Sequence, residues 1–441
     1  MNIRQGSLAI ALLPTGSRSA MEIKFDVVVI GAGPAGSSVA ILLASAGWSV
    51  ALVEKQSFPR RKVCGECIAA SNLPLLSALG VGTEFERRAG PALRRVAFMR
   101  GPHTAVTELP PANGSGFLWG RALGRETLDT LLTQKARAVG VQVFQPWSLN
   151  SACGRPGAWR CELKAVGSNA RATLCASIAI DAHGSWEVLP ASREEGGRIH
   201  GATDLLAFKA NFAGASLDDG LLPVLSFNGG YGGMVVADTR VTTLACCVRR
   251  DRLEALRHRV PGLSAGEAVE AMLVQECTGV RRTLSTASRL GPWVAAGPLR
   301  PGIRIHNDDG FFRVGNAAGE AHPIIGEGMS MALQSAWLLC AELLGAKREK
   351  RIHTAGDAAW QHMARRRYAR QWHQEFGPRM HLASLFAHAS MRAPTADALL
   401  MLLKAWPSLL SLGARWGGKT RCAVDAATIA SLSALRDAYE G

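Results

Sequence analysis

The chain has 441 residues, which is long for a single hydrophobic core, so we expect two or three lobes. The formal net charge of +15 bears on partners rather than on fold, and no recognition helix or aromatic-rich basic sheet accompanies it, which argues against nucleic-acid binding. The ten cysteines are scattered, mostly in apolar runs, as in reduced cytoplasmic proteins rather than in disulfide frameworks. Cys64 and Cys67 form a CxxC pair without a second pair, so we predict no metal site.

Residues 1–24 precede the first clear element. Their short apolar patch is interrupted by Pro14, so we expect a disordered leader rather than a signal peptide. The most apolar late run, 399–412, is broken by Lys404 and Pro407 and is too short to span a bilayer, although it could lie on one.

The stretch 27–36 organises the first part of the chain. Four consecutive β-branched residues, 27–30, predict a central parallel strand that is covered on both faces. In the glycine turn that follows, Gly31 permits the tight turn, Gly33 lets the backbone approach a pyrophosphate, and Gly36 lets the new helix pack on the strand. The phosphates would lie at the helix N-terminus near Pro34.

A second strand, 49–53, ends in Glu54, about 20 residues after the glycine turn, where an acid should accept a ribose hydroxyl. The loop 55–66 that follows is basic, and its cations would suit the phosphates of a dinucleotide.

The remaining elements follow in chain order. In the first half we expect a helix at 71–79, a strand at 94–99, a helix at 124–136, a strand at 141–144, and a hairpin of 159–166 with 172–180. In the second half we expect strands at 205–212, 224–227, 233–238 and 241–248, helices at 265–276 and 329–344, a buried strand before 315–320, and a basic helical remainder from 354 to 438.

Several motifs recur together in one group of proteins. They are GAGPAG at 31–36, the acid Glu54, Arg-x-x-Leu-Asp at 125–129, Ala-x-Gly-Ser at 182–185, and the late glycine motifs at 315–319 and 326–328. With this set the chain resembles, over about 25–344, FAD-dependent oxidoreductases of the p-hydroxybenzoate hydroxylase superfold. It looks most similar to the branch of geranylgeranyl reductases and flavin-dependent monooxygenases and halogenases.

The resemblance implies an α/β fold with an α+β second lobe. We predict a Rossmann-like FAD-binding domain at 25–90, 121–200 and 301–345, a mostly antiparallel-sheet substrate domain at 91–120 and 201–300, and a C-terminal basic helical region at 346–441.

The resemblance also implies how FAD is held. The glycine loop would cradle the pyrophosphate, the basic residues would contact phosphate, and Asn316 would touch the ribitol where an Asp is usual. The helix after 326–328 would direct its N–H groups at the pyrimidine edge of the flavin. The predicted cofactor-binding residues are Gly31, Gly33, Ala35, Gly36, Glu54, Lys62, Arg121, Arg125, Asn316, Gly326, Gly328 and Met329.

Four residues are candidates for proton chemistry, each with a simpler alternative. Cys64 is a proton donor or a small filler of the site wall, and Glu66 is a general acid or an exposed loop charge. His322 titrates near neutrality and would handle protons or hold its loop, whereas capping is the expected task of Glu327, between two glycines. The glycine-rich run 228–233 suggests a close approach of the backbone to substrate or flavin.

The function implied by the resemblance is that of an FAD-dependent monooxygenase. It would hydroxylate an aromatic or polypeptide- or carrier-borne substrate through a peroxyflavin, with NAD(P)H or a reductase as electron donor. The usual Asp-Gly pair stands here as His183-Gly184, so the route of reduction is open. Halogenation is disfavoured, because no Trp-x-Trp-x-Ile-Pro segment is present and 76–84 contains no lysine.

Two alternatives remain open. The loop Lys-x-Cys-Gly-Glu at 62–66 resembles that of geranylgeranyl reductases, which would make the protein a reductase of C=C bonds. The other alternative is a non-catalytic flavin-carrying protein that binds a partner. The basic cluster at 347–351 and 365–370 suggests an acidic protein partner or a peripheral membrane contact, against the simpler reading of a solvated helix face.

Overall fold

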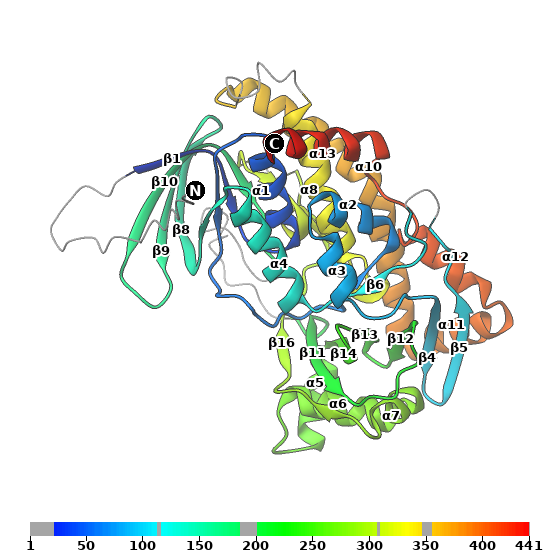
Figure 1. Ribbon diagram of the computed structural model, residues 1–441. Coiled ribbons are helices and arrows are strands. Elements are labelled where there is room, and N and C mark those ends of the chain that lie inside the picture. Colours follow the sequence, from blue (N-terminus) through cyan, green and yellow to red (C-terminus); the bar gives the residue numbers. More distant parts are fainter. Residues whose placement is uncertain (1–21, 113–115, 186–200, 307–308, 346–354, 441) are drawn as a thin grey trace, which may run out of the picture.

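The computed structural model describes residues 22–112, 116–185, 201–306, 309–345 and 355–440. The predicted leader therefore falls almost entirely outside the described residues, and the basic run 347–351 falls entirely outside them. Two large sheets form the framework of the molecule, with helices packed on each (Figure 1).

The first sheet contains the predicted glycine-turn strand at its centre. Its strand order is β7-β2-β1-β10-β9-β8, with β18 paired to β10. β1 runs parallel to both neighbours, and Val28 lies opposite Ala51 of β2 and Ala179 of β10. The bounds are β1 (Glu22–Ile30), β2 (Val50–Val53), β7 (Gln142–Phe144), β8 (Trp147–Arg155), β9 (Ala158–Ala165), β10 (Arg171–Asp181) and β18 (Phe312–Arg313).

Alternation of side chains along β1 divides the core of this region. Val27 and Val29 pack with the helices on one face, whereas Val28 and Ile30 pack with residues of β9 and β10 in a separate cluster. Seven helices of the described chain supply residues to the first cluster. They are α1 (Pro34–Ser45), α2 (Leu73–Ala78), α3 (Gly82–Arg88), α4 (Arg125–Ala138), α8 (Gly328–Leu344), α10 (Ala358–Met391) and α13 (Ala426–Glu440).

The second sheet has the order β15-β11-β14-β13-β12-β4-β5, with β16 paired to β11. It is antiparallel except where β12 runs parallel to β4. The bounds are β4 (Arg95–Arg100), β5 (His103–Glu108), β11 (Leu205–Ala213), β12 (Leu221–Phe227), β13 (Gly230–Ala237), β14 (Val241–Arg249), β15 (Ser288–Arg289) and β16 (Val294–Ala296). One face is covered by α5 (Arg250–Arg259), α6 (Ala265–Glu276) and α7 (Thr278–Leu284), at the bottom of Figure 1.

Two short sheets, β3 (Cys67–Ile68) with β6 (Arg121–Ala122) and β17 (Gly302–Ile303) with β19 (Gly319–Glu320), complete the strands. The mixed α/β architecture confirms the predicted fold class. The division into a discontinuous nucleotide-binding domain and a substrate domain stays a prediction.

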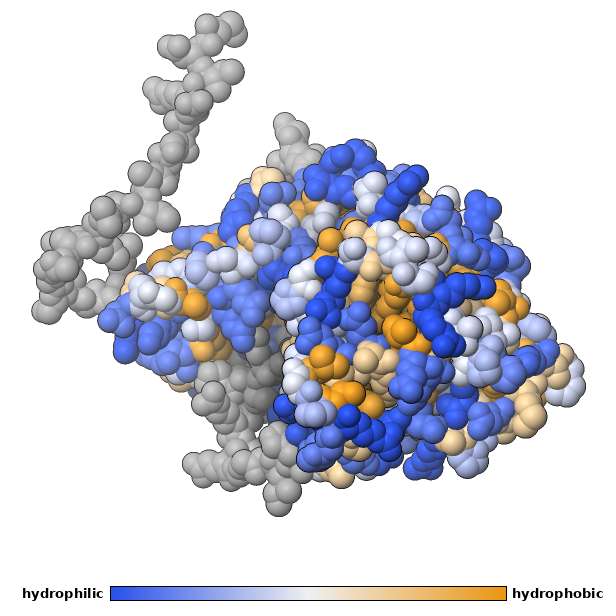
Figure 2. Space-filling view, turned by 90° about the horizontal axis from the view of Figure 1, so that it is seen from below, coloured by the Kyte–Doolittle hydropathy of each residue, from blue (hydrophilic) through white to orange (hydrophobic). Residues whose placement is uncertain are grey.

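The described part of the C-terminal region is helical and packs into the body of the molecule. α10 packs on α8 and reaches β12 and β13, and its Tyr368, Trp372 and Phe376 are buried in the first core. α11 (Ala393–Ala405) and α12 (Ser408–Trp416) lie beside β4 and β5 at the edge of the second sheet (Figure 1). Figure 2, which views the molecule from below, shows a mostly hydrophilic face with hydrophobic residues gathered in a hollow.

No single described helix is long and apolar enough to cross a bilayer, but α11 and α12, bent by 110°, meet that length and composition test as a pair. Among the described residues, no group of three His, Cys, Asp or Glu side chains is placed to hold a metal ion.

Candidate active site

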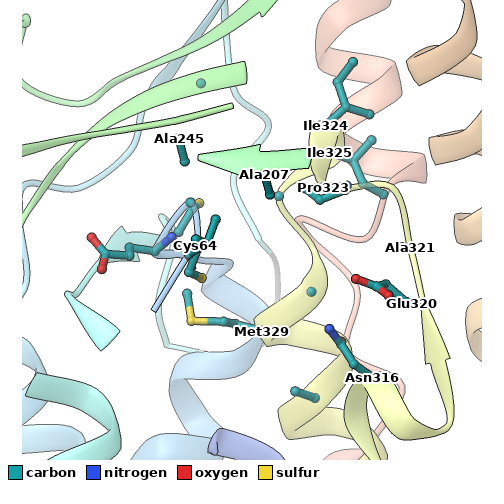
Figure 3. Close-up of a pocket in the computed structure, with 18 of the residues that line it drawn as sticks. Cys64, Ala207, Ala245, Asn316, Glu320, Ala321, Pro323, Ile324, Ile325 and Met329 are labelled. Atoms are coloured by element: carbon teal, nitrogen blue, oxygen red, sulfur yellow. Dashed lines mark hydrogen bonds between the residues drawn. The ribbon is translucent and has the colours of Figure 1, made fainter. Parts of the chain in front are cut away.

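A cavity of about 930 Å³ lies between the two sheets and the C-terminal helices. One end is formed by the glycine turn after β1 and by charged side chains, and the other is walled by apolar residues of β12 to β14, α11 and α12. In Figure 3, Cys64 and Met329 lie on one side of this space and Asn316 and Glu320 on another, with Ala207 and Ala245 above them.

The glycine turn lines the charged end. Gly31 has a φ of +109°, and a Cβ there would lie 2.6 Å from the carbonyl oxygen of Ala182. A Cβ on Gly36 would lie 1.9 Å from the Gly31 carbonyl oxygen, so neither position accepts a side chain. A Cβ on Gly33 meets only the Arg125 guanidinium at 3.6 Å and would otherwise point into open space. The protein itself leaves room for a side chain at Gly33 but not at Gly31 or Gly36, so the need for glycine at Gly33 points to a bound group.

Glu54 faces the same end, as predicted for the acid after β2. It is buried, and its carboxylate accepts hydrogen bonds from the backbone N–H of Ala32 at 3.1 Å and of Gln56 at 2.9 Å. These two bonds fix the carboxylate beside the glycine turn, the position that a ribose hydroxyl would reach.

Three cations gather around this end. Arg125, the first residue of α4, makes a two-bonded ion pair with Asp129, and both bonds are 2.8 Å long. Burial opposes its charge, yet Asp129 holds the pKa of Arg125 above its ordinary value. Burial and the charges of Arg125 and Arg60 lower the pKa of Lys62 to about 8. A bound diphosphate would relieve this repulsion, because it would place negative charge among the three cations.

Arg121 does not belong to this group, which corrects the prediction. Its guanidinium donates to the carbonyl oxygens of Glu86, Ala89 and Gly90, each at 2.8 Å, and so caps the end of α3. It is also absent from the cavity wall.

The late glycine motif supplies another wall. Asn316 lines the cavity, and its side-chain amide donates to the Ser185 hydroxyl at 2.6 Å. Gly326, with a φ of +63°, ends the turn before α8, and Gly328 and Met329 bring the N-terminus of that helix to the cavity (Figure 3). No acidic residue occupies the first turn of α1 or of α8, and the N-cap residue of α8, Glu327, is paired with Lys419, so both helix N-termini can face an anion.

A family model described as FAD binding domain matches residues 24–371. The chain belongs to this family. It is an FAD-dependent oxidoreductase, and the motifs that carried the sequence resemblance lie within the matched range. The glycine cradle, the Glu54 carboxylate and the cations around Lys62 fit a bound dinucleotide with its diphosphate, so the residues present suit FAD.

Relatives cover the chain to different extents. Conditioned medium factor receptor 1 of Dictyostelium discoideum is 25% identical over 413 residues, which cover 87% of this chain and 74% of that protein. A menaquinone reductase of Mycolicibacterium smegmatis is 32% identical over 124 residues, which span 28% of this chain and 29% of that protein. Among solved structures, the flavin-dependent brominase Bmp2 superimposes with a TM-score of 0.69 at 18% identity, covering 95% of this chain and 98% of that one. The structural likeness shows a shared fold.

Glu327 differs from the prediction. It precedes α8, but its side chain makes no capping hydrogen bond. Instead the carboxylate is buried, and the Lys419 ammonium lies 3.0 Å from it. Lys419 also donates to the Gly326 carbonyl oxygen at 3.0 Å. Burial opposes the charge of Lys419, yet Cys67 and Glu327 hold its pKa above the ordinary value.

Glu66 is neither an exposed charge nor a free acid. Its side chain is 1% exposed and forms a buried ion pair with Lys209 of β11. The carboxylate also accepts from the Thr243 hydroxyl and from the backbone N–H of Arg125 at 3.0 Å. Because three donors hold this carboxylate, Glu66 ties the loop to the second sheet, and the general-acid role is not supported.

Cys64 remains a candidate for proton chemistry, because it lines the cavity beside Met329 (Figure 3). A second candidate, which the sequence did not single out, is Glu320. It lines the cavity too, and burial raises the pKa of its carboxyl group. The backbone N–H of Arg300 donates to this carboxyl at 3.2 Å.

His322 does not titrate near neutrality. Burial and the neighbouring His388 lower the pKa of its imidazole to about 4. Its ring lies 3.2 Å from the Tyr231 hydroxyl and does not line the cavity. The predicted proton handling at neutral pH is therefore wrong, and His322 acts as a neutral hydrogen-bonding partner that holds its loop.

The glycine-rich run 228–233 lines the cavity from 231 to 233, but sheet packing also requires its glycines. A Cβ on Gly230 would lie 2.2 Å from the Phe227 ring, and one on Gly232 would lie 2.8 Å from the Ala245 carbonyl oxygen.

Sequence reasoning missed the two lysines that pair with the buried acids. Lys209 is a single charge within the apolar strand 205–213, and this pattern was the available signal. Lys419 has no comparable signal, because its partner Glu327 lies 92 positions earlier and the segment between them is irregular in composition.

Proposed function

We propose that this oxidoreductase is a monooxygenase that hydroxylates an apolar aromatic group, either free or borne by a larger molecule. One observation carries the proposal: the cavity that holds the FAD-binding residues continues into a chamber walled by Val224, Met234 and Leu403. Among the residues of this chamber, no unpaired charge is present to bind an ionic substrate. An apolar ring would therefore be bound by burial of its surface.

Bound FAD would supply the redox chemistry, passing electrons from a reduced nicotinamide or a reductase to dioxygen. The chain supplies position and environment. The N-terminus of α8 at Gly328 and Met329 stabilises negative charge on the group that it faces. The apolar walls exclude water, and this protects reactive species from hydrolysis.

The shape of the cavity supports a carrier-borne group. Its lining extends from Cys64 to Trp416 at the end of α12, and Trp416 is 65% exposed. A substrate could place its aromatic group beside the flavin-binding residues while the rest of the molecule stays outside.

A second candidate is reduction of a C=C bond, and Cys64 favours it. Adding hydrogen to an alkene requires a proton donor beside the hydride source, and the Cys64 thiol lines the cavity next to Met329. The similarity to a menaquinone reductase points in the same direction over 28% of the chain.

Isotope labelling separates these reactions. The FAD-loaded enzyme would be supplied with NADH or NADPH, a panel of alkylated phenols, indoles and quinones, and bromide. A monooxygenase should place one oxygen atom from isotopically heavy dioxygen in its product. Deuterium from deuterated water in a saturated product, or bromide in the product, would refute monooxygenation in favour of reduction or halogenation.

Replacement of Cys64 gives an independent test. For a monooxygenase, Cys64→Ser should retain hydroxylation, with Cys153→Ser, at an exposed thiol, as the matched control. For a reductase, Cys64→Ser should stop alkene reduction and leave oxygen uptake unchanged.

A further inference from the structure

The α11–α12 hairpin, residues 393–416, has an unusually apolar surface. Of the thirteen large hydrophobic side chains that are exposed in the described chain, six lie on this hairpin. Met401, Trp406 and Trp416 are 60% to 66% exposed. A monomeric protein in water rarely concentrates exposed apolar residues in this way, so the patch indicates an interaction surface.

The hairpin is held firmly by its other face. Leu400, Leu403 and Leu410 are buried and pack in one cluster with Val96 and Phe98 of β4. The exposed residues are therefore not core residues of a loosely placed helix. They form the outer face of a packed hairpin whose two helices meet at 110°.

Three exposed cations lie on or directly before this hairpin. They are Lys404, Arg415 and Arg392, the residue before α11, and none forms an ion pair with an acid in the described part of the chain. The one acid within 392–418 is Asp397, and Arg100 lies 2.6 Å from its carboxylate. Exposed cations beside exposed tryptophans and leucines match the interface of an anionic bilayer, where apolar side chains enter the acyl boundary and cations meet the headgroups.

The apolar surface is continuous with the cavity. Leu402, Leu409, Leu412 and Trp416 are all exposed, and all four also line the cavity. A molecule dissolved in lipid could thus pass from the surface of the hairpin into the chamber without crossing water.

We propose that the α11–α12 hairpin docks on an anionic lipid surface and that the apolar substrate enters from the lipid. The second half of this statement rests on the proposed function, whereas the docking does not. Binding of a protein partner or of a second copy would bury the same side chains, but neither explains why the exposed apolar surface runs into the cavity.

Vesicle flotation tests the docking. The FAD-loaded full-length protein is mixed with vesicles of phosphatidylcholine alone or with added phosphatidylglycerol. It should float with the anionic vesicles and much less with the neutral ones. Met401→Ser combined with Trp406→Ser should weaken binding about tenfold or more, because neither side chain then enters the acyl boundary. Neither residue lines the cavity, so FAD content should not change.

Matched controls are Val166→Ser and Leu263→Ser, whose side chains are 51% and 41% exposed away from the hairpin. Lys404→Glu with Arg415→Glu should abolish the preference for anionic vesicles. Equal flotation of the hairpin variants and the controls would overturn the proposal, as would absence of wild-type binding. Dimers that dissociate in the Met401/Trp406 variant would instead assign the patch to a second copy.

The two proposals fail separately. If flotation behaves as expected but no labelled oxygen enters any product, the monooxygenase function is wrong and the docking stands. If turnover of a long-chain substrate does not rise when anionic vesicles are added, entry from the lipid is refuted.

Discussion

Replacing Lys209 by methionine tests whether the buried pair with Glu66 organises the site. Lys209 is fully buried in β11, and its ammonium is the cation that pairs with the Glu66 carboxylate. In Lys209→Met that carboxylate keeps its bonds from Thr243 and from the Arg125 backbone but loses its counter-charge. Breaking one side of a buried pair costs about 3–5 kcal/mol. We therefore expect a loss of about 3 kcal/mol in the free energy of unfolding, because methionine fills most of the vacated volume.

The double variant Lys209→Met with Glu66→Gln should recover most of this loss. The glutamine amide oxygen can still accept hydrogen bonds, and no uncompensated charge remains buried. Urea unfolding followed by tryptophan fluorescence gives the four free energies of the cycle, with Lys164→Met at an exposed position of β9 as the control. The reasoning is refuted if Lys209→Met matches this control, or if the double variant is no more stable than the single one.

Three further predictions use other parts of the site. Gly33→Val should fold but lose its yellow colour, since the side chain fills space next to Arg125 that the diphosphate needs; full FAD content at normal stability would contradict the cradle. The pKa of His322 is lowered to about 4, so as the pH falls the imidazole is protonated in the unfolded chain before it is protonated in the folded one. The free energy of unfolding should therefore fall by about 3 kcal/mol between about pH 6.5 and pH 4. His322→Asn should lose less stability than the wild type between pH 7 and pH 5, measured as the urea midpoint of unfolding at each pH. If the variant and the wild type lose the same amount, His322 does not cause the acid sensitivity. Arg366 and Arg370 are exposed and line one cleft, so replacing both by Glu should leave the FAD content intact. If an acidic partner binds in this cleft, the double variant should turn over more slowly, and the wild-type rate should fall as the salt concentration rises.

Most of the predicted site residues that the structure brings to the cavity near the glycine turn lie close together in the sequence. The strand at 27–30, the glycines of the turn and Glu54 lie within 28 residues. The structure shows the steric contacts that require Gly31 and Gly36 and the hydrogen bond that holds Glu54 beside them. The same holds for the helix that begins at 328, whose N-terminus follows directly from its glycines.

The errors concern side chains whose environment is set by distant residues. Glu66 was expected to be a general acid or an exposed loop charge, but it is buried and paired with Lys209, which lies 143 residues away in the sequence. His322 was expected to titrate near neutrality, but His388 and the surrounding burial come from α10. Arg121 was placed on a phosphate because it is basic and close to α4, whereas the end of α3 has three carbonyl groups that it satisfies. Spacing along the chain carries no information on any of these contacts.

Two buried ion pairs connect three separate parts of the chain around the cavity, through its lining residues Glu66 and Lys419. Glu66 is paired with Lys209 from the second sheet, and Glu327 is paired with Lys419, which follows α12 by three positions. Buried pairs add little stability compared with apolar packing, but a lost partner is costly, so each pair favours one arrangement over its alternatives. Lys209 thereby fixes the second sheet against the loop 62–66. Lys419 fixes the end of the α11–α12 hairpin against the N-terminus of α8, which lines the cavity. The same pair therefore holds the exposed apolar surface of the hairpin at the mouth of that cavity.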